Sequence, residues 1–132
     1  MVSKTGLVHR NFGPVSGFPF SQAVLDGDYA HLSGVLSAPE GKVTPGTADF
    51  ETTQCMKQIV FMLTELGLTV SDLTRVNLYI TNLDDFQEIN AAYMKFFPEK
   101  LFPARTCVAV AKLLGGTRIE IEATARIIKH SM

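Results

Sequence analysis

The chain has 132 residues, of which 46% are hydrophobic and 19% charged, and its 12 basic residues nearly balance its 13 acidic ones. This size and composition predict one compact domain over residues 1–132 and exclude a disordered chain. Because the formal net charge is −1 and no lysines or arginines cluster, we expect no nucleic-acid partner.

The sequence also lacks targeting, membrane and metal signals. Its N-terminal segment has no apolar stretch of about 7–15 residues, as a secretory signal requires, and no window approaches the roughly 18 apolar residues of a membrane span. Neither Cys55 nor Cys107 belongs to a C-x-x-C motif or has a nearby histidine. We therefore expect a cytoplasmic protein with reduced thiols, no membrane contact, and no metal or cofactor.

The first third of the chain predicts a hairpin between two loops. Residues 11–20 are rich in glycine and proline and form a loop-like entry. Two apolar stretches, 21–25 and 29–37, then flank Asp26-Gly27-Asp28, which is a strong hairpin signal. Residues 38–46 are again rich in glycine and proline and are predicted to form a loop.

Two segments have helical periodicity. The first begins at Thr47, whose side chain suits an N-cap, and ends at Gly67. The second covers 84–97, where Asp85 and Glu88 have the spacing of a capping box and a proline follows. Its apolar stripe consists of Phe86, Ile89/Asn90, Tyr93 and Phe96/Phe97.

Three further segments predict strands. Residues 73–81 alternate between apolar and polar side chains, as in a half-buried strand. Segments 105–112 and 118–127 flank Gly115-Gly116, and we predict that they pair as a hairpin. Two strands, a helix, a strand, a helix and two strands describe an α+β sandwich, a mainly antiparallel sheet with two helices on one face.

The strand at 105–112 is apolar on both of its faces. An antiparallel sheet that is covered on one side only should carry polar residues on the other. A second subunit is the simplest cover for the helix-free face, so we predict an oligomer.

Arg105 at the start of this strand carries a permanent charge and admits two interpretations. If the last two strands form a hairpin, Arg105 and Glu120 lie toward the same open end and could form an exposed salt bridge. Alternatively, the guanidinium is a fork for a carboxylate ligand, beside an acid that could hold water. The pattern alone favours the salt bridge.

The other candidates are weaker. Cys107 is better interpreted as a small core residue than as a nucleophile, although its backbone could bind a ligand at a strand edge. Ser33 lies in no G-x-S-x-G motif. The three histidines, His9, His31 and His130, do not form a ligand set.

At "FPARTCVAVAKLLGGTRIEIEATA" (residues 102–125) the sequence resembles the Rid family of imine/enamine deaminases, also described as YjgF-type or endoribonuclease L-PSP proteins. "PFSQAV" at 19–24, "LSG" at 32–34 and residues 63–93 extend the resemblance over nearly the whole chain. The family implies a chorismate-mutase-like fold and a homotrimer with sites between subunits. Its enzymes hydrolyse 2-iminoacids and 2-aminoacrylate-type enamines to 2-oxoacids and ammonia.

The resemblance also implies roles for individual residues. Arg105 would hold the substrate carboxylate, Cys107 would supply main-chain contacts, Ser33 a hydroxyl contact, and Glu120 would position the water. No metal or cofactor is implied. The chain departs from many members at two positions, with Phe20 in place of Tyr and Val35 in place of Gln, and these apolar residues are expected to favour bulkier iminoacids.

The alternative hypothesis is a trimer that binds a small carboxylate without catalysis. Some relatives have been described as chaperone-like or as acting in translation, and such a role would also be non-catalytic. Binding a carboxylate requires only the arginine. The presence of both Arg105 and Glu120 therefore favours the enzyme.

Overall fold

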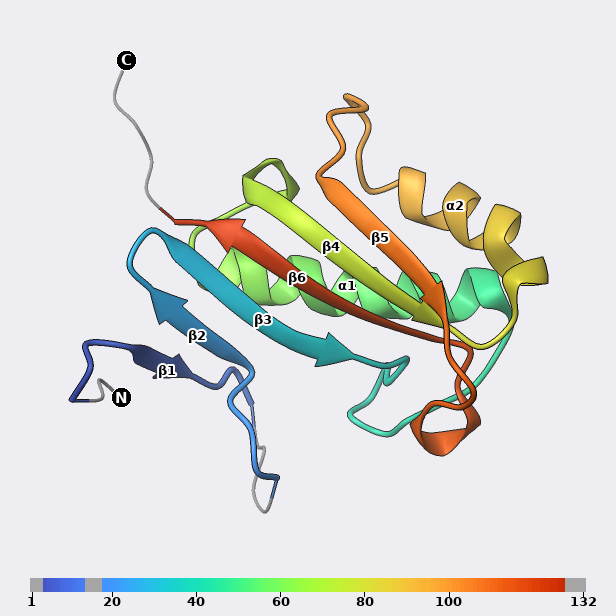
Figure 1. The fold of residues 1–132 in the computed structure, drawn as a ribbon, viewed down its shortest axis with the longest axis horizontal. Helices are drawn as coiled ribbons and strands as arrows, with labels where there is room; N and C mark the ends of the chain where they lie inside the picture. Colours follow the sequence, from blue (N-terminus) through green and yellow to red (C-terminus); the bar gives the residue numbers. More distant parts are fainter. Residues whose placement is uncertain (1–3, 14–17, 128–132) are drawn as a thin grey trace.

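The computed structural model describes residues 4–13 and 18–127. Two helices lie behind one face of a six-stranded sheet (Figure 1), which confirms the predicted α+β arrangement. The helices are α1 (Ala48–Glu65) and α2 (Phe86–Met94). The strands are β1 (Val8–Arg10), β2 (Ala23–Asp26), β3 (Tyr29–Val35), β4 (Leu73–Ile80), β5 (Ala104–Ala109) and β6 (Ile119–Arg126).

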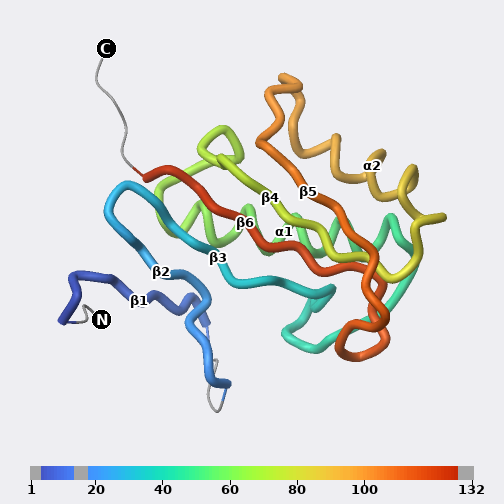
Figure 2. Tube along the Cα trace, viewed as in Figure 1, coloured from blue at the N-terminus to red at the C-terminus, as the bar shows by residue number. Residues whose placement is uncertain are grey.

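The strand order is β1-β2-β3-β6-β4-β5, and every pair is antiparallel except β4 with β5. The predicted hairpin between the last two strands is wrong, because β4 lies between them (Figure 2). The β4–α2–β5 segment is a crossover that joins parallel neighbours. The chain then passes the end of β4, where Val110 N–H donates to the Ile80 carbonyl (2.7 Å), and returns as β6.

The N-terminal hairpin is confirmed. Asp26 pairs with Tyr29 across a two-residue turn, and Gly27 has a positive φ of 57° that glycine adopts without strain. Strand β1, which pairs with β2, was not predicted because three residues are too few to show a period. Residues 14–17 of the predicted entry loop, and His130, lie outside the described residues.

Helix α1 begins and ends as predicted. The Thr47 hydroxyl accepts a hydrogen bond from Phe50 N–H (3.1 Å), and Gly67 follows the helix with a φ of 75°. Helix α2 is shorter than predicted and its capping box is wrong. The Asp85 side chain caps nothing, and the Glu88 carboxylate accepts from Asp49 N–H at the start of α1 (2.7 Å).

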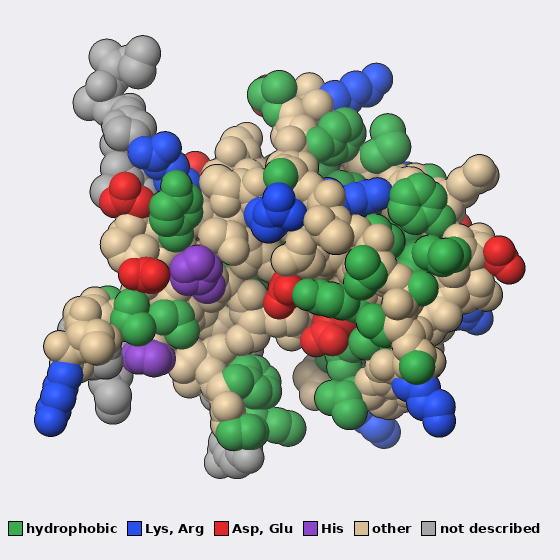
Figure 3. Space-filling model, in the orientation of Figure 1, with side chains coloured by type: hydrophobic (Ala, Val, Ile, Leu, Met, Phe, Trp, Pro, Cys, Tyr) green, Lys and Arg blue, Asp and Glu red, His purple; other side chains and the backbone are tan. Residues whose placement is uncertain are grey.

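The core lies between the helices and the sheet. It contains alternate residues of the two central strands, β4 and β6, together with the inner face of α1. Glu120 and Glu122 alternate with these buried residues and therefore point away from the helices. Figure 3 shows this helix-free face, on which basic side chains are scattered and acidic ones lie near hydrophobic ones. None of the helices formed by the described residues is long and apolar enough to cross a membrane.

Candidate active site

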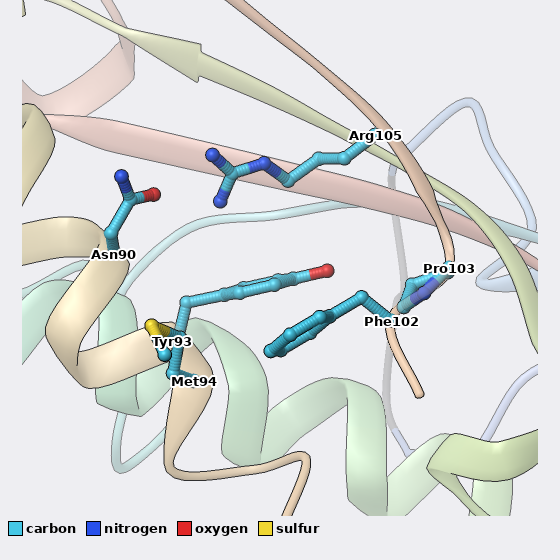
Figure 4. A pocket seen from close by; sticks show the side chains of 6 residues that line it. All are labelled: Asn90, Tyr93, Met94, Phe102, Pro103 and Arg105. Carbon is cyan, nitrogen blue, oxygen red and sulfur yellow. The ribbon is translucent and has the colours of Figure 1, made fainter. Parts of the chain in front are cut away.

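Arg105 lies on the helix-covered side of the sheet, beside α2. It pairs in register with Val76, a fully buried residue of β4, and paired residues point to the same face of a sheet. Its side chain lines a cavity of about 280 Å³, which we call the arginine cavity. The other lining residues are Asn90, Tyr93, Met94, Phe102 and Pro103 (Figure 4).

Aromatic rings of α2 hold the Arg105 guanidinium. Its central carbon lies 5.0 Å from the centre of the Tyr93 ring and 5.7 Å from that of Phe86. Two such cation–π contacts contribute about 0.5–2 kcal/mol each and restrict the side chain. The salt bridge to Glu120 is wrong, since the two ion pairs among the described residues are His31–Asp26 and Arg118–Asp85.

Two polar atoms in the arginine cavity are buried without a hydrogen-bond partner among the described residues: Oδ1 of Asn90 and the hydroxyl of Tyr93. Burial raises the pKa of Tyr93 to about 12, although the charge of Arg105 acts in the opposite direction. The phenol therefore stays protonated at neutral pH and can donate. Buried polar atoms without partners are destabilising. The guanidinium without an acid and the Tyr93 hydroxyl suit an anionic group, whereas Oδ1 of Asn90 suits a hydrogen-bond donor.

Cys107 follows two residues after Arg105 on the same face of β5 and is partly buried. Burial raises the pKa of its thiol, and the charge of Arg105 only partly opposes this shift. A thiol with a raised pKa is a poor nucleophile at neutral pH. This agrees with the prediction that the Cys107 side chain is not a nucleophile.

Glu120 lies on the other face of the sheet, in register with Tyr79 of β4. Its carboxylate packs directly over Gly34 of β3, where an added β-carbon would lie 2.5 Å from Oε2 of Glu120. Only glycine leaves room for the carboxylate there. Glu120 lines a cavity of about 580 Å³, which we call the glutamate cavity and which Phe20 and Ser33 also line.

Glu122 is the second carboxylate on this face of β6. It accepts hydrogen bonds from the Tyr79 hydroxyl and from Nδ2 of Asn77 (3.1 Å). The pKa of Glu120 is raised, first by burial and second by the charge of Glu122. Glu120 therefore holds a proton at a higher pH than an ordinary glutamate.

This shift predicts a pH-dependent effect of Glu120→Gln on thermal stability. A carboxyl whose pKa is higher in the folded than in the unfolded state lowers stability as pH rises through that range. A glutamine stays neutral, so the melting temperature of E120Q should exceed that of the wild type at pH 8, and the gap should narrow toward pH 4. Differential scanning calorimetry of both proteins between pH 4 and pH 8 measures this difference in melting temperature.

The Glu122→Gln variant provides the control. When both proteins also carry Glu122→Gln, the difference in melting temperature between the Glu120→Gln protein and the one that keeps Glu120 should depend less on pH. It should still depend on pH, because burial is the larger cause of the raised pKa of Glu120. A gap that stays constant between pH 4 and pH 8 would show that Glu120 does not have a raised pKa.

Ser33 and Phe20 both lie in the glutamate cavity. The Ser33 hydroxyl donates to the Ser21 carbonyl (2.6 Å), so its oxygen remains able to accept. The Phe20 ring is half-exposed and packs against Phe18, with 5.8 Å between ring centres. Among the described residues, no group of three or more His, Cys, Asp or Glu side chains could hold a metal ion.

The five predicted site residues thus form two groups within one chain. Arg105 and Cys107 belong to the arginine cavity side, whereas Phe20, Ser33 and Glu120 line the glutamate cavity. Along β4, the partners of Arg105 and Glu120 are three residues apart, which is about 10 Å, and β5 and β6 flank β4 at a separation of about 10 Å. The side chains also point to opposite faces, so a small ligand cannot touch both in one chain.

Sequence reasoning missed the polar groups of α2 that line the arginine cavity. It placed Asn90 and Tyr93 in an apolar stripe, and both do lie on the sheet-facing side. The available signal was the polar amide of Asn90 within that stripe, because a buried amide needs a partner. The support of Glu122 by Tyr79 and Asn77 was also missed, since it joins two strands that are far apart in sequence.

Comparisons of sequence place these residues in a family. A family model described as Endoribonuclease L-PSP matches residues 13–127. A RutC family protein of Buchnera aphidicola is 34% identical over 120 residues, which cover 89% of this chain and 94% of that protein. The protein mmf1, mitochondrial, of Schizosaccharomyces pombe is 34% identical over 113 residues, which cover 83% of this chain and 69% of that protein.

Solved structures share the fold. RidA from an Antarctic Psychrobacter superposes with a TM-score of 0.78 at 29% identity, over 86% of this chain and 93% of that one. E. coli TdcF with bound serine superposes with a TM-score of 0.78 at 31% identity, over 86% of this chain and 91% of that one. The described architecture is therefore that of the L-PSP and Rid proteins.

Proposed function

Because the chain belongs to the endoribonuclease L-PSP family, which includes the Rid proteins, we propose that it is a hydrolytic deaminase of 2-iminoacids and related enamines. The observation that carries the proposal is the Arg105 guanidinium, which lacks an acidic partner among the described residues and faces a cavity with two unpartnered polar atoms. Such a site suits a small ligand with a carboxylate.

Binding of the substrate begins with its carboxylate. The guanidinium offers two parallel N–H donors, which match the two oxygens of a carboxylate. The cation–π contacts with Tyr93 and Phe86 restrict the position of the guanidinium before the ligand arrives. The amide of Asn90 and the Tyr93 hydroxyl supply further polar contacts, and the backbone of Cys107 borders the same side of β5.

Hydrolysis then needs one aimed water molecule and a proton carrier. Water adds to C2 of the imine while Glu120 takes one of its protons and gives it to the imine nitrogen, which leaves a neutral carbinolamine. Glu120 then moves the hydroxyl proton of the carbinolamine to the same nitrogen, the C2–N bond breaks as the C2=O bond forms, and one water is consumed for each ammonia released. A carboxyl with a raised pKa suits this exchange near neutral pH.

The two groups of residues must come from two copies of the chain, because within one chain they lie on opposite faces of the sheet. We propose a homotrimer in which Arg105 of one copy meets Glu120 of the next. A head-to-tail contact that closes into a ring gives each subunit one such site. The partly exposed apolar residues beside Glu120, among them Phe20, support a covered position for this face.

The alternative is a trimer that binds a small carboxylate without catalysis. The related TdcF structure contains bound serine, and serine carries a carboxylate. Chaperone-like or translation-associated action would also fit this alternative. Cytoplasmic location is likewise a proposal, drawn from bacterial relatives, since the S. pombe relative is by name mitochondrial.

The test generates a 2-iminoacid in place with an amino-acid oxidase and catalase, then follows its loss against the spontaneous rate. We expect the wild-type protein to accelerate formation of 2-oxoacid and ammonia in equal amounts. A protein that binds the 2-oxoacid product but leaves the spontaneous rate unchanged would be the non-catalytic binder.

A further inference from the structure

We infer that the glutamate cavity selects 2-iminoacids with a bulky, uncharged, apolar side chain, such as a branched aliphatic or aromatic group. This inference rests on the proposed function and names its substrate class. It follows from the size of the cavity, from its lining and from the position of Glu120 at its wall.

The first step is the volume. The glutamate cavity measures about 580 Å³, twice the arginine cavity at about 280 Å³, and falls within the range of small-ligand pockets. If the carboxylate is bound on the arginine side and the water on Glu120, the remaining substituent of C2 needs its own space. The larger cavity adjoins Glu120 and provides it.

The second step is the apolar wall. Most of the lining is aliphatic or aromatic and comes from β3, the loop after it, α1 and the turn before β6. Several of these side chains remain substantially exposed, including Phe61 at 51% and Phe20 at 50%. The apolar lining includes Phe20, Val35, Leu36, Val43, Phe61 and Leu114. Covering such a wall with an apolar substituent is favourable.

The third step concerns the polar residues that line the glutamate cavity, whose side chains already form hydrogen bonds within the protein. The Ser33 hydroxyl donates to Ser21, Nε2 of Gln58 donates to the Leu36 carbonyl (2.5 Å), and Oε1 of Gln22 accepts from Phe12 N–H (2.5 Å). Glu120 is the one charged residue that lines the cavity among the described residues. A second carboxylate on the substrate would face Glu120, and a cation would occupy the oxygens that hold the water.

The experiment compares kcat/KM for imines generated from leucine, alanine, glutamate and lysine. We expect the leucine-derived imine to be preferred over the alanine-derived one by at least about tenfold, since each added methylene in an apolar pocket contributes roughly 10-fold or more. Both charged imines should be poorer than the leucine-derived one. Preference for the alanine-derived or a charged imine would overturn the inference while leaving hydrolysis established.

Filling the cavity provides the second arm. Ala38 lines the cavity, so Ala38→Phe should fill part of it and lower the leucine-to-alanine ratio of kcat/KM by about tenfold. Ala38→Leu is the milder variant, with a smaller change in the same direction. Ala91→Phe on exposed α2, outside the described cavities, is the matched control and should leave the ratio unchanged. An unchanged ratio in both Ala38 variants would contradict the inference.

A binding measurement separates the inference from the proposed reaction. The 2-oxoacid products cannot be deaminated, and all of them carry the same carboxylate, so the difference between their Kd values reports the glutamate cavity. We expect 4-methyl-2-oxopentanoate to bind at least about tenfold more tightly than pyruvate, and Ala38→Phe to remove the difference. If no imine is hydrolysed but this difference is found, the proposed function fails and the ligand class stands; equal affinities would overturn the ligand class.

Discussion

Replacing Arg105 by alanine is expected to lower kcat/KM for 2-iminoacid hydrolysis by about 10³-fold. The variant loses two charge-assisted hydrogen bonds to the substrate carboxylate, at about 2 kcal/mol each, and about 4 kcal/mol of transition-state stabilisation corresponds to about three powers of ten. The measurement is the loss of imine generated in place, with wild type and variant at matched concentration.

Two further variants make this prediction specific. Arg105→Lys keeps the charge but not the planar fork, so it should recover only part of the loss. Arg10→Ala is the matched control, because the guanidinium of Arg10 also lies against an aromatic ring, 5.2 Å from the centre of Phe12, yet lines neither the arginine cavity nor the glutamate cavity. Equal acceleration by wild type and Arg105→Ala would remove Arg105 from the mechanism.

The elements of this fold were largely predictable because their signals are local. The Asp-Gly-Asp turn, the Thr47 cap and the strict alternation over β6 each depend on neighbours within a few residues. Hydrophobic period, capping residues and turn signals therefore together gave both helices and five of the strands. The start of α2 was predicted wrongly because the Glu88 carboxylate accepts from Asp49 N–H of α1, 39 residues away in the sequence, and such a contact leaves no local signal.

Strand order was not predictable in the same way. Gly115 and Gly116 do have positive φ, as a turn would require, so the glycine pair correctly marked a reversal. However, the segment between β5 and β6 spans the nine residues 110–118, enough to pass the end of β4. The helix between β4 and β5 was the better guide, because strands joined through a helix are usually parallel neighbours.

This difference in order changes the interpretation of the site. In a hairpin, Arg105 and Glu120 would form a surface salt bridge, and this pair would explain both charges without a ligand. With β4 between them and opposite faces in use, each charge needs another partner. The helix α2 explains only one face of the strand at 105–112: Arg105 and Cys107 face α2, whereas Val108 is exposed on the helix-free face, which is the face that the proposed trimer covers.

The arrangement of the two groups leads to the sharpest test of the proposed site. Arg105→Ala and Glu120→Gln should each be nearly inactive, since a positioned general base contributes about 10²–10⁴-fold. If every site combines Arg105 of one copy with Glu120 of the next, mixing the two variants should restore activity. No other variant pair distinguishes a shared site from a single-chain site as directly.

The size of the recovery follows from the geometry of a closed ring. With equal amounts and random exchange, half of the copies carry an intact Arg105 and half an intact Glu120. A site with both is therefore expected about one time in four, which gives about a quarter of wild-type activity. Co-expression of the two variants with different tags, followed by sequential purification and the imine assay, measures this recovery.

The control mixes Arg105→Ala with the double variant that carries both substitutions, where no copy supplies an intact arginine and activity should stay absent. Sedimentation of each preparation shows whether the copies associate. Persistent inactivity of mixed oligomers that contain both single variants would mean that one chain supplies the whole site. Within one chain, however, β4 separates Arg105 from Glu120, and a small substrate cannot touch both. A site supplied by one chain would therefore exclude Glu120 as the group that activates the water.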